Sequence, residues 1–444
     1  MLSSSIFCLE MKDKDWSPRN PTLYRHLERL AKRVFKWILN QTNSGGNVRE
    51  LVREEVSLKD NGSFNIATKA TLDWGHLLYT NRKEIRALPG FEESVKSVSG
   101  DKEVEAFRHY GKEIPEDIAD HFIFSFLLRL IARIPSLKFN HLVFDACYQE
   151  TEGVIYSSTV EFRAWSALKN FDSPIDMLPI ANNLRVRRLS RPEQEQRLQR
   201  ALQPFSGERS LEIYRTPFVI EMEHTIPRGG PYSLEEPVRA FGRVISGLRL
   251  FKPGALGLGA IHQRTVQWQP DVGGTLSSSI YETPFFGPTY ELTKAEADEF
   301  LEFYNQLVRK RPSIKGSLEL AIRRFDLAYE RAYPADKLID MMIAFEALFL
   351  PERDELALRL SLRVANLLRD EEDRQEIFKK MKRAYKLRSH IVHGTEIDNK
   401  ELVACVQAVE ELLRKSLRSL LKSIEQGHHL RSVISQLDDA TFKY

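Results

Sequence analysis

The sequence predicts a multidomain α+β protein, with a mixed α/β N-terminal and middle region followed by an all-α C-terminal helical bundle. Three observations support this fold class. Apolar residues recur at helical spacing in the first third, they alternate with polar residues in parts of the middle third, and only helical signals follow Thr293. We therefore expect four parts: a mostly helical N-terminal region 1–137, a mixed α+β middle domain 138–315, a helical bundle 316–426 and a C-terminal tail 427–444.

The composition is that of a globular protein, because 42% of the 444 residues are hydrophobic and 29% are charged. A net charge of +3 is too small to attract nucleic acid by itself, so a basic surface would have to be local. The cysteines lie far apart, which argues against a disulfide framework or a zinc cluster and favours a reducing compartment. The most apolar stretch, residues 122–134, contains Arg129 and Arg133, which predicts a buried helix. We expect a cytoplasmic protein with no membrane contact and no metal or other cofactor.

Helix signals dominate the N-terminal region. Asn20 followed by Pro21 combines a capping residue with proline at the first helical position, and apolar residues follow at helical spacing. Asp60-Asn61-Gly62 predicts a turn. Two further helices are expected at about 101–112 and 116–135, the second of them internal.

The apolar period changes to two in the middle domain. A β-hairpin is predicted from three consecutive signals. Apolar and polar residues alternate over 141–148, a turn ends at Gly153, and the alternation resumes over 154–162. Further strands are expected at residues 218–224 and 256–268.

Two capping boxes and a loop complete the middle domain. Ser190 with Glu193, and Ser233 with Glu236, each predict the start of a helix, because Ser and Glu three residues apart can satisfy free backbone N–H groups. Residues 269–292 are rich in Gly, Ser, Thr and Pro and predict a long loop.

The C-terminal third is expected to be helical throughout. Thr293 with Glu296 forms a third capping box. Apolar residues then recur at helical spacing, which predicts helices near residues 294–310, 317–332, 335–349, 354–369, 371–393 and 398–424.

A charged residue interrupts the apolar stripe of two of these helices. Arg388 falls among residues that include Ile377, Met381, Ala384, Ile391 and Val392. Glu346 falls among Ile339, Met342, Ile343 and Leu350. A buried charge is costly unless it is paired or serves a site. We therefore expect Arg388 and Glu346 to meet inside the bundle, either as a structural pair or as part of a functional site.

The helix that carries Arg388 is also strongly basic. Residues 377–394 contain six Lys or Arg residues and no Asp or Glu. A phosphate-bearing partner would meet a concentrated positive field there, whereas a solvated basic face is the simpler alternative. The candidate RNA contacts are Lys379, Lys380, Lys382, Arg383 and Lys386.

His393 follows Arg388 by five residues, which is about 140° around an ideal helix. Gly394 comes next and is typical of a helix end, so His393 is expected where the Arg388 side chain could still approach it. An arginine that binds phosphate and a histidine that transfers protons suit RNA cleavage, because RNA supplies its own 2′-OH nucleophile. The alternative is that His393 is a favourable cation in the last turn.

These residues resemble a known family. The run Ile339-Asp-Met-Met-Ile-Ala-Phe-Glu-Ala-Leu-Phe349, then Glu355, then Tyr385-Lys-Leu-Arg-Ser-His-Ile-Val-His-Gly394, is similar to the Apea-like branch of the HEPN superfamily. The resemblance covers roughly residues 316–425, about a quarter of the chain. It implies an α-helical bundle that forms a homodimer, in which two Arg-x4-His motifs build one composite site.

The resemblance also implies an activity, because many HEPN proteins are metal-independent endoribonucleases of toxin and phage-defence systems. Arg388 would then polarise the scissile phosphate and His393 would act as general acid or base. Glu346, Tyr385, Ser389 and His390 would be supporting residues. Active members often have Asn, Asp or His after the arginine, where this chain has Ser389. Residues 1–315 would sense a regulatory protein or a phage-derived trigger.

Two alternatives remain open. The first is a non-catalytic HEPN protein for dimerisation or RNA binding, in which Arg388 pairs structurally with Glu346. The second places a metal-dependent nuclease or a ligand sensor in the middle domain, around Asp145 on one strand and Glu161 and Arg163 on the next.

Overall fold

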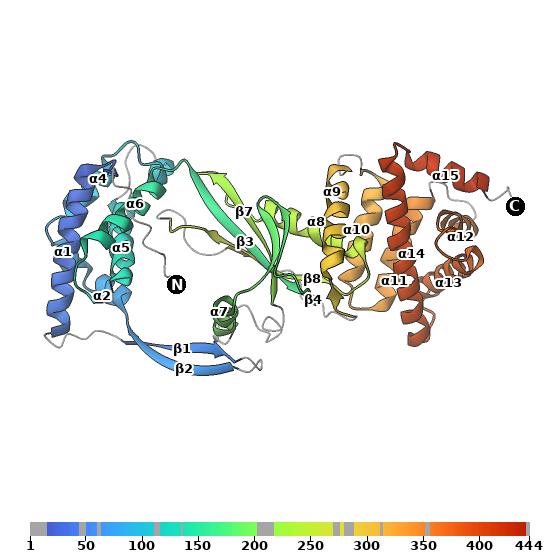
Figure 1. Cartoon of the computed structure of the whole chain (residues 1–444), viewed down its shortest axis with the longest axis horizontal. Helices are drawn as coiled ribbons and strands as arrows, with labels where there is room; N and C mark the ends of the chain where they lie inside the picture. The colour runs from blue at the N-terminus through green and yellow to red at the C-terminus, as the bar shows by residue number, and fades with distance from the viewer. Residues whose placement is uncertain are drawn as a thin grey trace.

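The computed structural model describes residues 16–43, 50–59, 64–110, 116–134, 136–201, 217–269, 276–278, 288–310, 314–350 and 356–440. The molecule is elongated, with a group of helices at the N-terminal end, a sheet in the middle and a helical bundle at the C-terminal end (Figure 1). The predicted combination of α and β structure with a helical C-terminal region is confirmed.

The N-terminal helices share one hydrophobic core. Its main elements are α1 (Pro21–Asn43), α4 (Phe91–Ser99), α5 (Glu116–Arg133) and α6 (His141–Ile155), with the shorter α2 (Trp74–Thr80) and α3 (Arg82–Arg86) beside them. Helix α1 begins where the sequence predicts, because Asn20 Oδ1 accepts a hydrogen bond from the Leu23 N–H at 2.9 Å. The helix expected at 101–112 is instead a short 3-10 helix, η1 (Glu105–Tyr110).

The prediction of a β-hairpin beginning at residue 141 is wrong, because residues 141–155 form helix α6. Asn140 caps this helix by accepting the Val143 N–H at 3.2 Å. Its buried residues include Phe144 together with Cys147 and Tyr148, which follow Phe144 by three and four positions and lie with it in the N-terminal core. In so apolar a segment, the same residues fit both an alternating pattern over eight positions and an apolar stripe along one helix face. Burial of the helical stripe determines the structure here.

A two-stranded ribbon that the sequence analysis missed extends from the N-terminal helices toward α7 (Figure 1). Strands β1 (Glu50–Leu58) and β2 (Phe64–Leu72) are antiparallel, and the turn expected at residues 60–62 lies outside the described residues. Val56 and Leu58 pack against Leu198 of α7 (Arg191–Ala201). Most described side chains of β2 are exposed, so this strand lacks the buried face that gives a strand its apolar alternation.

A six-stranded antiparallel sheet forms the centre of the molecule, in the order β5-β6-β7-β3-β8-β9. The strands are β3 (Thr159–Lys169), β5 (Met177–Ala181), β6 (Leu184–Arg188), β7 (Phe218–Pro227), β8 (Gly257–Thr265) and β9 (Leu276–Ser278). The strands expected at 218–224 and 256–268 are therefore confirmed, and the predicted strand at 154–162 begins only at Thr159.

Two helices, α8 (Glu235–Phe251) and α9 (Lys294–Lys310), pack against this sheet through a second core. The capping box of Thr293 and Glu296 is formed as predicted, with the Thr293 N–H 2.9 Å from Glu296 Oε2. The capping box expected at Ser233 is not formed, because the N-cap residue of α8 is Leu234. The segment expected as a loop contains β9 and β10 (Tyr290–Glu291), the latter paired with β4 (Phe171–Asp172).

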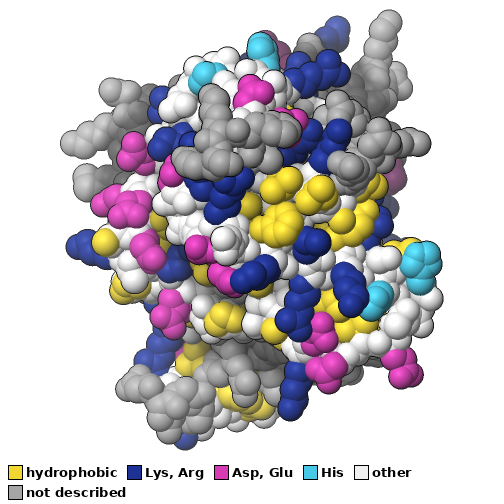
Figure 2. Space-filling model, turned by 90° about the vertical axis from the view of Figure 1, so that its right-hand side faces the viewer, with side chains coloured by type: hydrophobic (Ala, Val, Ile, Leu, Met, Phe, Trp, Pro, Cys, Tyr) yellow, Lys and Arg dark blue, Asp and Glu magenta, His cyan; other side chains and the backbone are white. Residues whose placement is uncertain are grey.

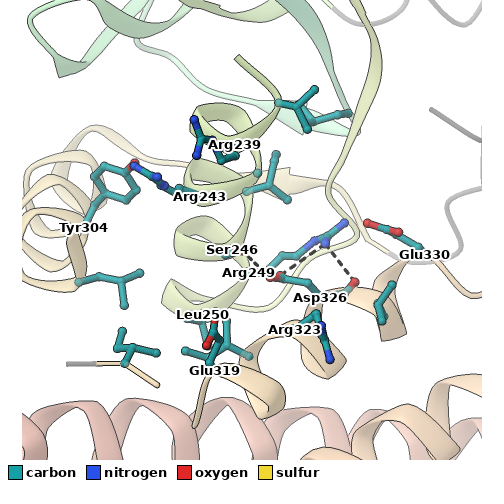
Figure 3. Close-up of a pocket in the computed structure, with 18 of the residues that line it drawn as sticks. Arg239, Arg243, Ser246, Arg249, Leu250, Tyr304, Glu319, Arg323, Asp326 and Glu330 are labelled. Atoms are coloured by element: carbon teal, nitrogen blue, oxygen red, sulfur yellow. Dashed lines mark hydrogen bonds and ion pairs between the residues drawn. The ribbon is translucent and has the colours of Figure 1, made fainter. Parts of the chain in front are cut away.

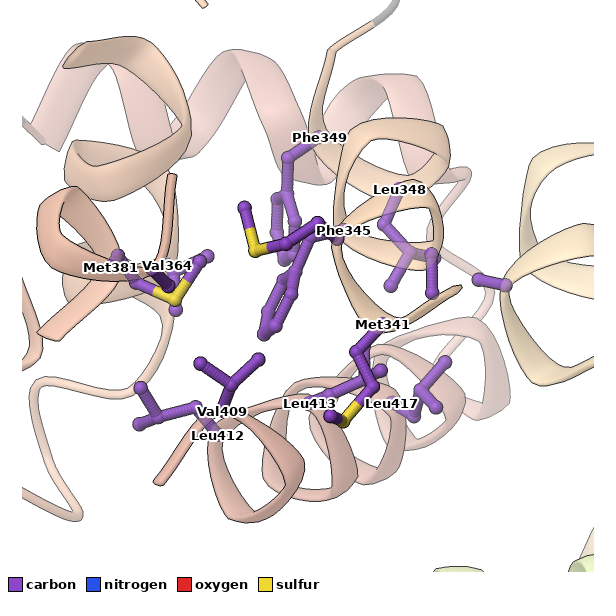
Figure 4. Packing of buried hydrophobic residues seen from close by; sticks show 14 of the residues in the cluster. Met341, Phe345, Leu348, Phe349, Val364, Met381, Val409, Leu412, Leu413 and Leu417 are labelled. Carbon is purple, nitrogen blue, oxygen red and sulfur yellow. The ribbon is translucent and has the colours of Figure 1, made fainter. Parts of the chain in front are cut away.

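The C-terminal bundle contains the five predicted helices around a third core (Figure 4). They are α10 (Ser317–Tyr329), α11 (Pro334–Phe349), α12 (Leu356–Leu367), α13 (Arg374–Val392) and α14 (Asn399–Glu425). Phe345 and Phe349 of α11 face Val364, Met381 and Val409 from three other helices in this core. The predicted burial of the apolar helix faces against one another is confirmed.

A further helix, α15 (Leu430–Asp439), lies within the part predicted to be a tail. Its Val433 and Leu437 belong to the bundle core. The buried Arg363 of α12 binds the Asp438 carboxylate through Nε and Nη2, both at 2.7 Å. The helix is only ten residues long, so contacts with α12 and not its own length must stabilise it.

This contact predicts the effect of Asp438→Asn. Hydrogen bonds from Arg363 lower the pKa of Asp438, so the pair stabilises the fold above the ordinary value of 3.8 and loses its effect as the pH falls through the lowered pKa. At pH 7 the substitution should cost about 1–2 kcal/mol of unfolding free energy, because Asp438 is partly exposed and the buried guanidinium keeps its hydrogen bond to the Phe349 carbonyl. Urea unfolding measures this cost. Asp439→Asn, at an exposed neighbour, is the control, and equal costs for both substitutions would contradict the account.

Candidate functional site

Arg388 and Glu346 meet as predicted, at the edge of the bundle core. Arg388 Nη2 of α13 lies 3.6 Å from Glu346 Oε1 of α11. The two side chains are 28% and 25% exposed, so the pair is reachable from solvent and is not enclosed inside the bundle. The buried side of α13 explains this position. Its buried residues are Ile377, Met381, Ala384 and Leu387, and Arg388 directly follows the last of them.

The apolar stripes proposed from the sequence are therefore shifted. Val392, assigned to the stripe of α13, is 57% exposed. The fully buried carboxylate of α11 is Asp340, which binds Arg324 at 2.7 Å and Arg331 at 2.6 Å. Sequence reasoning missed this structural cluster, although Asp340 interrupts the apolar run of α11 just as Glu346 does. The pair at the core edge, with fewer hydrogen bonds, is the better candidate for a site.

The Arg388–Glu346 pair is incompletely satisfied. Among the described residues, Arg388 Nε and Glu346 Oε1 are buried atoms without a hydrogen-bond partner. Burial raises the pKa of Glu346, and the positive charge of Arg388 offsets only part of that increase. The Arg388 guanidinium also lies 6.0 Å from the centre of the Tyr385 ring. The guanidinium thus keeps hydrogen-bonding capacity that an anionic ligand could use.

His393 is exposed at the end of α13, where a Schellman motif holds the chain. The Gly394 N–H bonds to the Ile391 carbonyl at 3.1 Å, and the Thr395 N–H bonds to the His390 carbonyl at 2.9 Å. Gly394 has φ +73°, which favours glycine. The predicted helix end at this glycine is confirmed. The imidazole is presented to solvent at the C-terminal end of the helix.

The other supporting residues act mainly through the backbone. The Ser389 carbonyl accepts the His393 N–H at 3.1 Å, and the His390 carbonyl belongs to the Schellman motif. No hydrogen bond or ion pair joins Arg388 to His393 within the described part of the chain, so one copy of α13 does not by itself bring them into contact. Glu355 of the family motif lies outside the described residues.

The basic residues of α13 are less free than the sequence suggests. Lys379 pairs with Glu376 at 2.8 Å, Lys380 with Glu372 at 3.0 Å, and Arg383 with Glu401 at 3.0 Å. Each of these carboxylates lies just outside the segment 377–394, which contains none. On the C-terminal end of the molecule as a whole, Lys and Arg side chains lie among Asp and Glu side chains and around hydrophobic areas (Figure 2).

Lys382 and Lys386 remain for a phosphate-bearing partner. Lys382 Nζ lies 5.6 Å from the centre of the Phe378 ring, and Lys386 is exposed. The structure shows no ion pair for either side chain among the residues that it describes. The basic surface available along α13 is therefore small and local.

The residues of the middle-domain alternative do not come together. Asp145 lies on α6, not on a strand, and accepts a hydrogen bond from the Tyr24 hydroxyl at 2.5 Å. Arg163 of β3 instead pairs with Glu223 at 2.8 Å. Within the described ranges, no group of three or more His, Cys, Asp or Glu residues could hold a metal ion.

Comparison of the chain with models of protein families, with curated proteins and with solved structures found no match in any of the three. The resemblance to the HEPN superfamily therefore stays a prediction. Among the helices in the described ranges, none is both long and apolar enough to cross a membrane.

The Schellman motif predicts the effect of Gly394→Ala. No atom lies within 4 Å of an added Cβ, so the cost is the left-handed backbone alone, about 1–2 kcal/mol of unfolding free energy. Gly427, with φ +85°, ends α14 in the same way and offers a matched comparison. Urea unfolding of Gly394→Ala and Gly427→Ala should give similar losses. An Ala at position 394 that costs nothing would mean that α13 does not end as described.

The raised pKa of Glu346 predicts that Glu346→Gln stabilises the protein at pH 7. A folded state that binds this proton more tightly loses stability as the pH rises from the ordinary value of 4.5 through the raised pKa, and glutamine mimics the neutral form throughout. Melting temperatures from pH 4 to 8 test this. Lys415 and Lys380 lower the pKa of Glu372, so Glu372→Gln should destabilise over the same range. If Glu346→Gln is the less stable protein at pH 7, the ion pair is a net stabilising contact.

Proposed function

We propose that this chain is a metal-independent endoribonuclease of HEPN type, with Arg388 and His393 at its active site. The observation that carries the proposal is the incompletely satisfied guanidinium of Arg388. It lies 3.6 Å from Glu346, is partly exposed, and is on the helix that ends at the exposed His393. Arg324 of the structural cluster also has an Nε without a partner, but its Nη1 binds Asp340 at 2.7 Å, whereas the contact between Arg388 and Glu346 is no shorter than 3.6 Å.

The chemistry divides between the two side chains. The 2′-OH of RNA attacks the adjacent phosphorus, and His393 transfers the proton that this step or the departure of the 5′ oxygen requires. Arg388 offsets the negative charge on the pentavalent phosphate, because a guanidinium binds two phosphate oxygens at once. Glu346 holds Arg388 in position without occupying its hydrogen-bond donors. Lys382 and Lys386 would contact neighbouring phosphates along α13.

Two copies of the chain would complete the site. Arg388 and His393 are about 140° apart on one helix, so a single copy offers poor convergence on one phosphate. A twofold axis near the end of α13 would bring two Arg388 residues and two His393 residues together. A homodimer through the C-terminal bundle is therefore part of the proposal, with residues 1–315 in a regulatory role in a toxin or phage-defence setting.

The second candidate is a non-catalytic dimerisation or RNA-binding protein. The observation that favours it is the ion pair between Arg388 and Glu346, which would then serve the bundle alone. Ser389, where active HEPN proteins often have Asn, Asp or His, fits this candidate as well.

The proposal predicts that Arg388→Ala and His393→Ala each reduce cleavage of single-stranded RNA in EDTA by at least about a hundredfold. Arg388→Lys should fail too, because an ammonium cannot bind phosphate in the same planar geometry. Gel assays of initial rates measure the losses. Arg431→Ala and His428→Ala remove the same residue types from exposed positions near the C-terminus and should cleave normally.

A further pair of variants distinguishes the effect of moving His393 from the effect of a general loss of stability. Gly394→Ala should slow cleavage by moving the histidine, whereas Gly427→Ala, with the same expected stability loss, should not. Sedimentation should show a dimer for the active protein. His393→Ala cleaving at the parent rate, or full activity in a strict monomer, would overturn the proposal.

A further inference from the structure

A cavity of about 600 Å³ lies between α8, which packs on the sheet, and α9 and α10 (Figure 3). Each helix contributes one face at helical spacing, including Arg239, Gly242, Arg243 and Ser246 from α8. Tyr304 and Leu307 of α9 and Ile322 and Leu327 of α10 give apolar walls. The volume is within the range of small-molecule sites, about 300–1,000 Å³.

One end of the cavity is fixed by a hydrogen-bonded cluster. The Ser246 hydroxyl donates to the Asp326 carboxylate, and Arg249 Nη1 donates to the Asp326 backbone carbonyl at 3.1 Å (Figure 3). Arg249 Nη1 also lies 3.5 Å from Asp326 Oδ1. These contacts and the Leu256 carbonyl occupy the Arg249 guanidinium, whereas Asp326 Oδ1 has no hydrogen-bond partner among the described residues.

Two other arginines, nearer the N-terminus of α8, line the same cavity without a close carboxylate partner among the described residues. Arg239 and Arg243 are one turn apart, where like charges destabilise a helix. Within the described ranges, the one ion pair of Arg239 is a loose contact with the exposed Glu235 at 3.7 Å. Arg243 is half-buried, its Nε has no hydrogen-bond partner among the described residues, and it extends from α8 toward Tyr304 (Figure 3). Glu319 of α10 and Glu330, the residue that follows this helix, are exposed and also line the cavity.

Gly242 is an independent indication that the cavity holds a ligand. Glycine inside a helix costs stability relative to alanine and needs a reason. For Gly247 the reason is packing, because a Cβ there would lie 2.8 Å from Tyr304 Cδ2. For Gly242 no atom lies within 4 Å of an added Cβ, and the residue faces the cavity. Packing within the described residues therefore does not explain this glycine, whereas an occupant of the cavity would.

We propose that this cavity binds a small organic anion with an apolar body. The anionic group is held by Arg243 and Arg239, and the apolar body lies against Gly242 and the side chains of α9 and α10. Helix α8 belongs to the sheet core and α10 to the bundle core. The ligand therefore contacts both parts of the molecule and stabilises their junction. This site is independent of Arg388 and His393, so it does not rest on the ribonuclease proposal.

The probe for the test is 1-anilinonaphthalene-8-sulfonate, an apolar anion whose fluorescence rises when it is bound. The full-length protein should bind it saturably at one site per chain, and Gly242→Leu should weaken that binding at least tenfold by filling the cavity. Gly242→Leu should keep or raise the melting temperature, because leucine favours helix and meets open space. Gly153→Leu is the matched control, since Gly153 is also helical, exposed and free of atoms within 4 Å of an added Cβ.

A second variant tests whether Arg243 binds the anionic group of the ligand. Arg243→Met keeps an apolar stem and removes the charge, so it should weaken the sulfonate probe at least tenfold. It should leave binding of the uncharged N-phenyl-1-naphthylamine nearly unchanged. Unaltered binding of the sulfonate to Gly242→Leu, or no saturable binding to the parent protein, would overturn the cavity site. Equal affinity of parent and Arg243→Met for the sulfonate would overturn the anion subsite.

Discussion

Two buried arginines at the junction of the sheet and the bundle hold the molecule together. Arg249 of α8 donates to the carbonyls of Leu256 and Asp326, and Arg414 of α14 donates to the Arg249 carbonyl at 2.8 Å. Their side chains are 4% and 2% exposed, so removing a partner would strand a charge away from water. Because the network joins α8, α10 and α14, it fixes the orientation of the bundle and the walls of the cavity at the same time.

The bundle uses its charges in two different ways. At the junction and around Asp340, each buried charge has several close partners, and these clusters serve stability. At the core edge, Arg388 and Glu346 are partly exposed, and atoms of both lack hydrogen-bond partners in the described structure. Burial raises the pKa of Glu346 despite the nearby cation, so the charged carboxylate is less favourable at this position than in water. Such a local cost is typical of functional sites, where ligand binding and not folding supplies the missing partner.

The sequence predicted the helices of the C-terminal bundle, because apolar residues recur there at helical spacing over segments long enough to exclude strands. The Arg388–Glu346 contact and the helix end at Gly394 also followed from local pattern. Prediction from the sequence failed for the elements whose structure is decided by tertiary contacts. Residues 141–148 alternate like a strand, yet the N-terminal core buries Phe144 and Tyr148 on one helix face. The ribbon β1–β2 and helix α15 depend on contacts with α7 and α12, which no local pattern contains. One copy of α13 does not bring Arg388 and His393 into contact in the described structure, and the convergence that we propose would need a second chain, which local pattern does not describe either.

The chemical identity of the RNA ends distinguishes attack by the neighbouring 2′-OH from attack by water. The protein should be incubated in EDTA with an RNA that it cuts at a known position and with the same RNA carrying a single 2′-deoxynucleotide there. The account predicts a 2′,3′-cyclic phosphate and a 5′-hydroxyl at the cut, and no cleavage at the deoxy position, because the attacking group is the neighbouring 2′-OH. Products with 3′-hydroxyl and 5′-phosphate ends, or equal cleavage of the deoxy substrate, would contradict it.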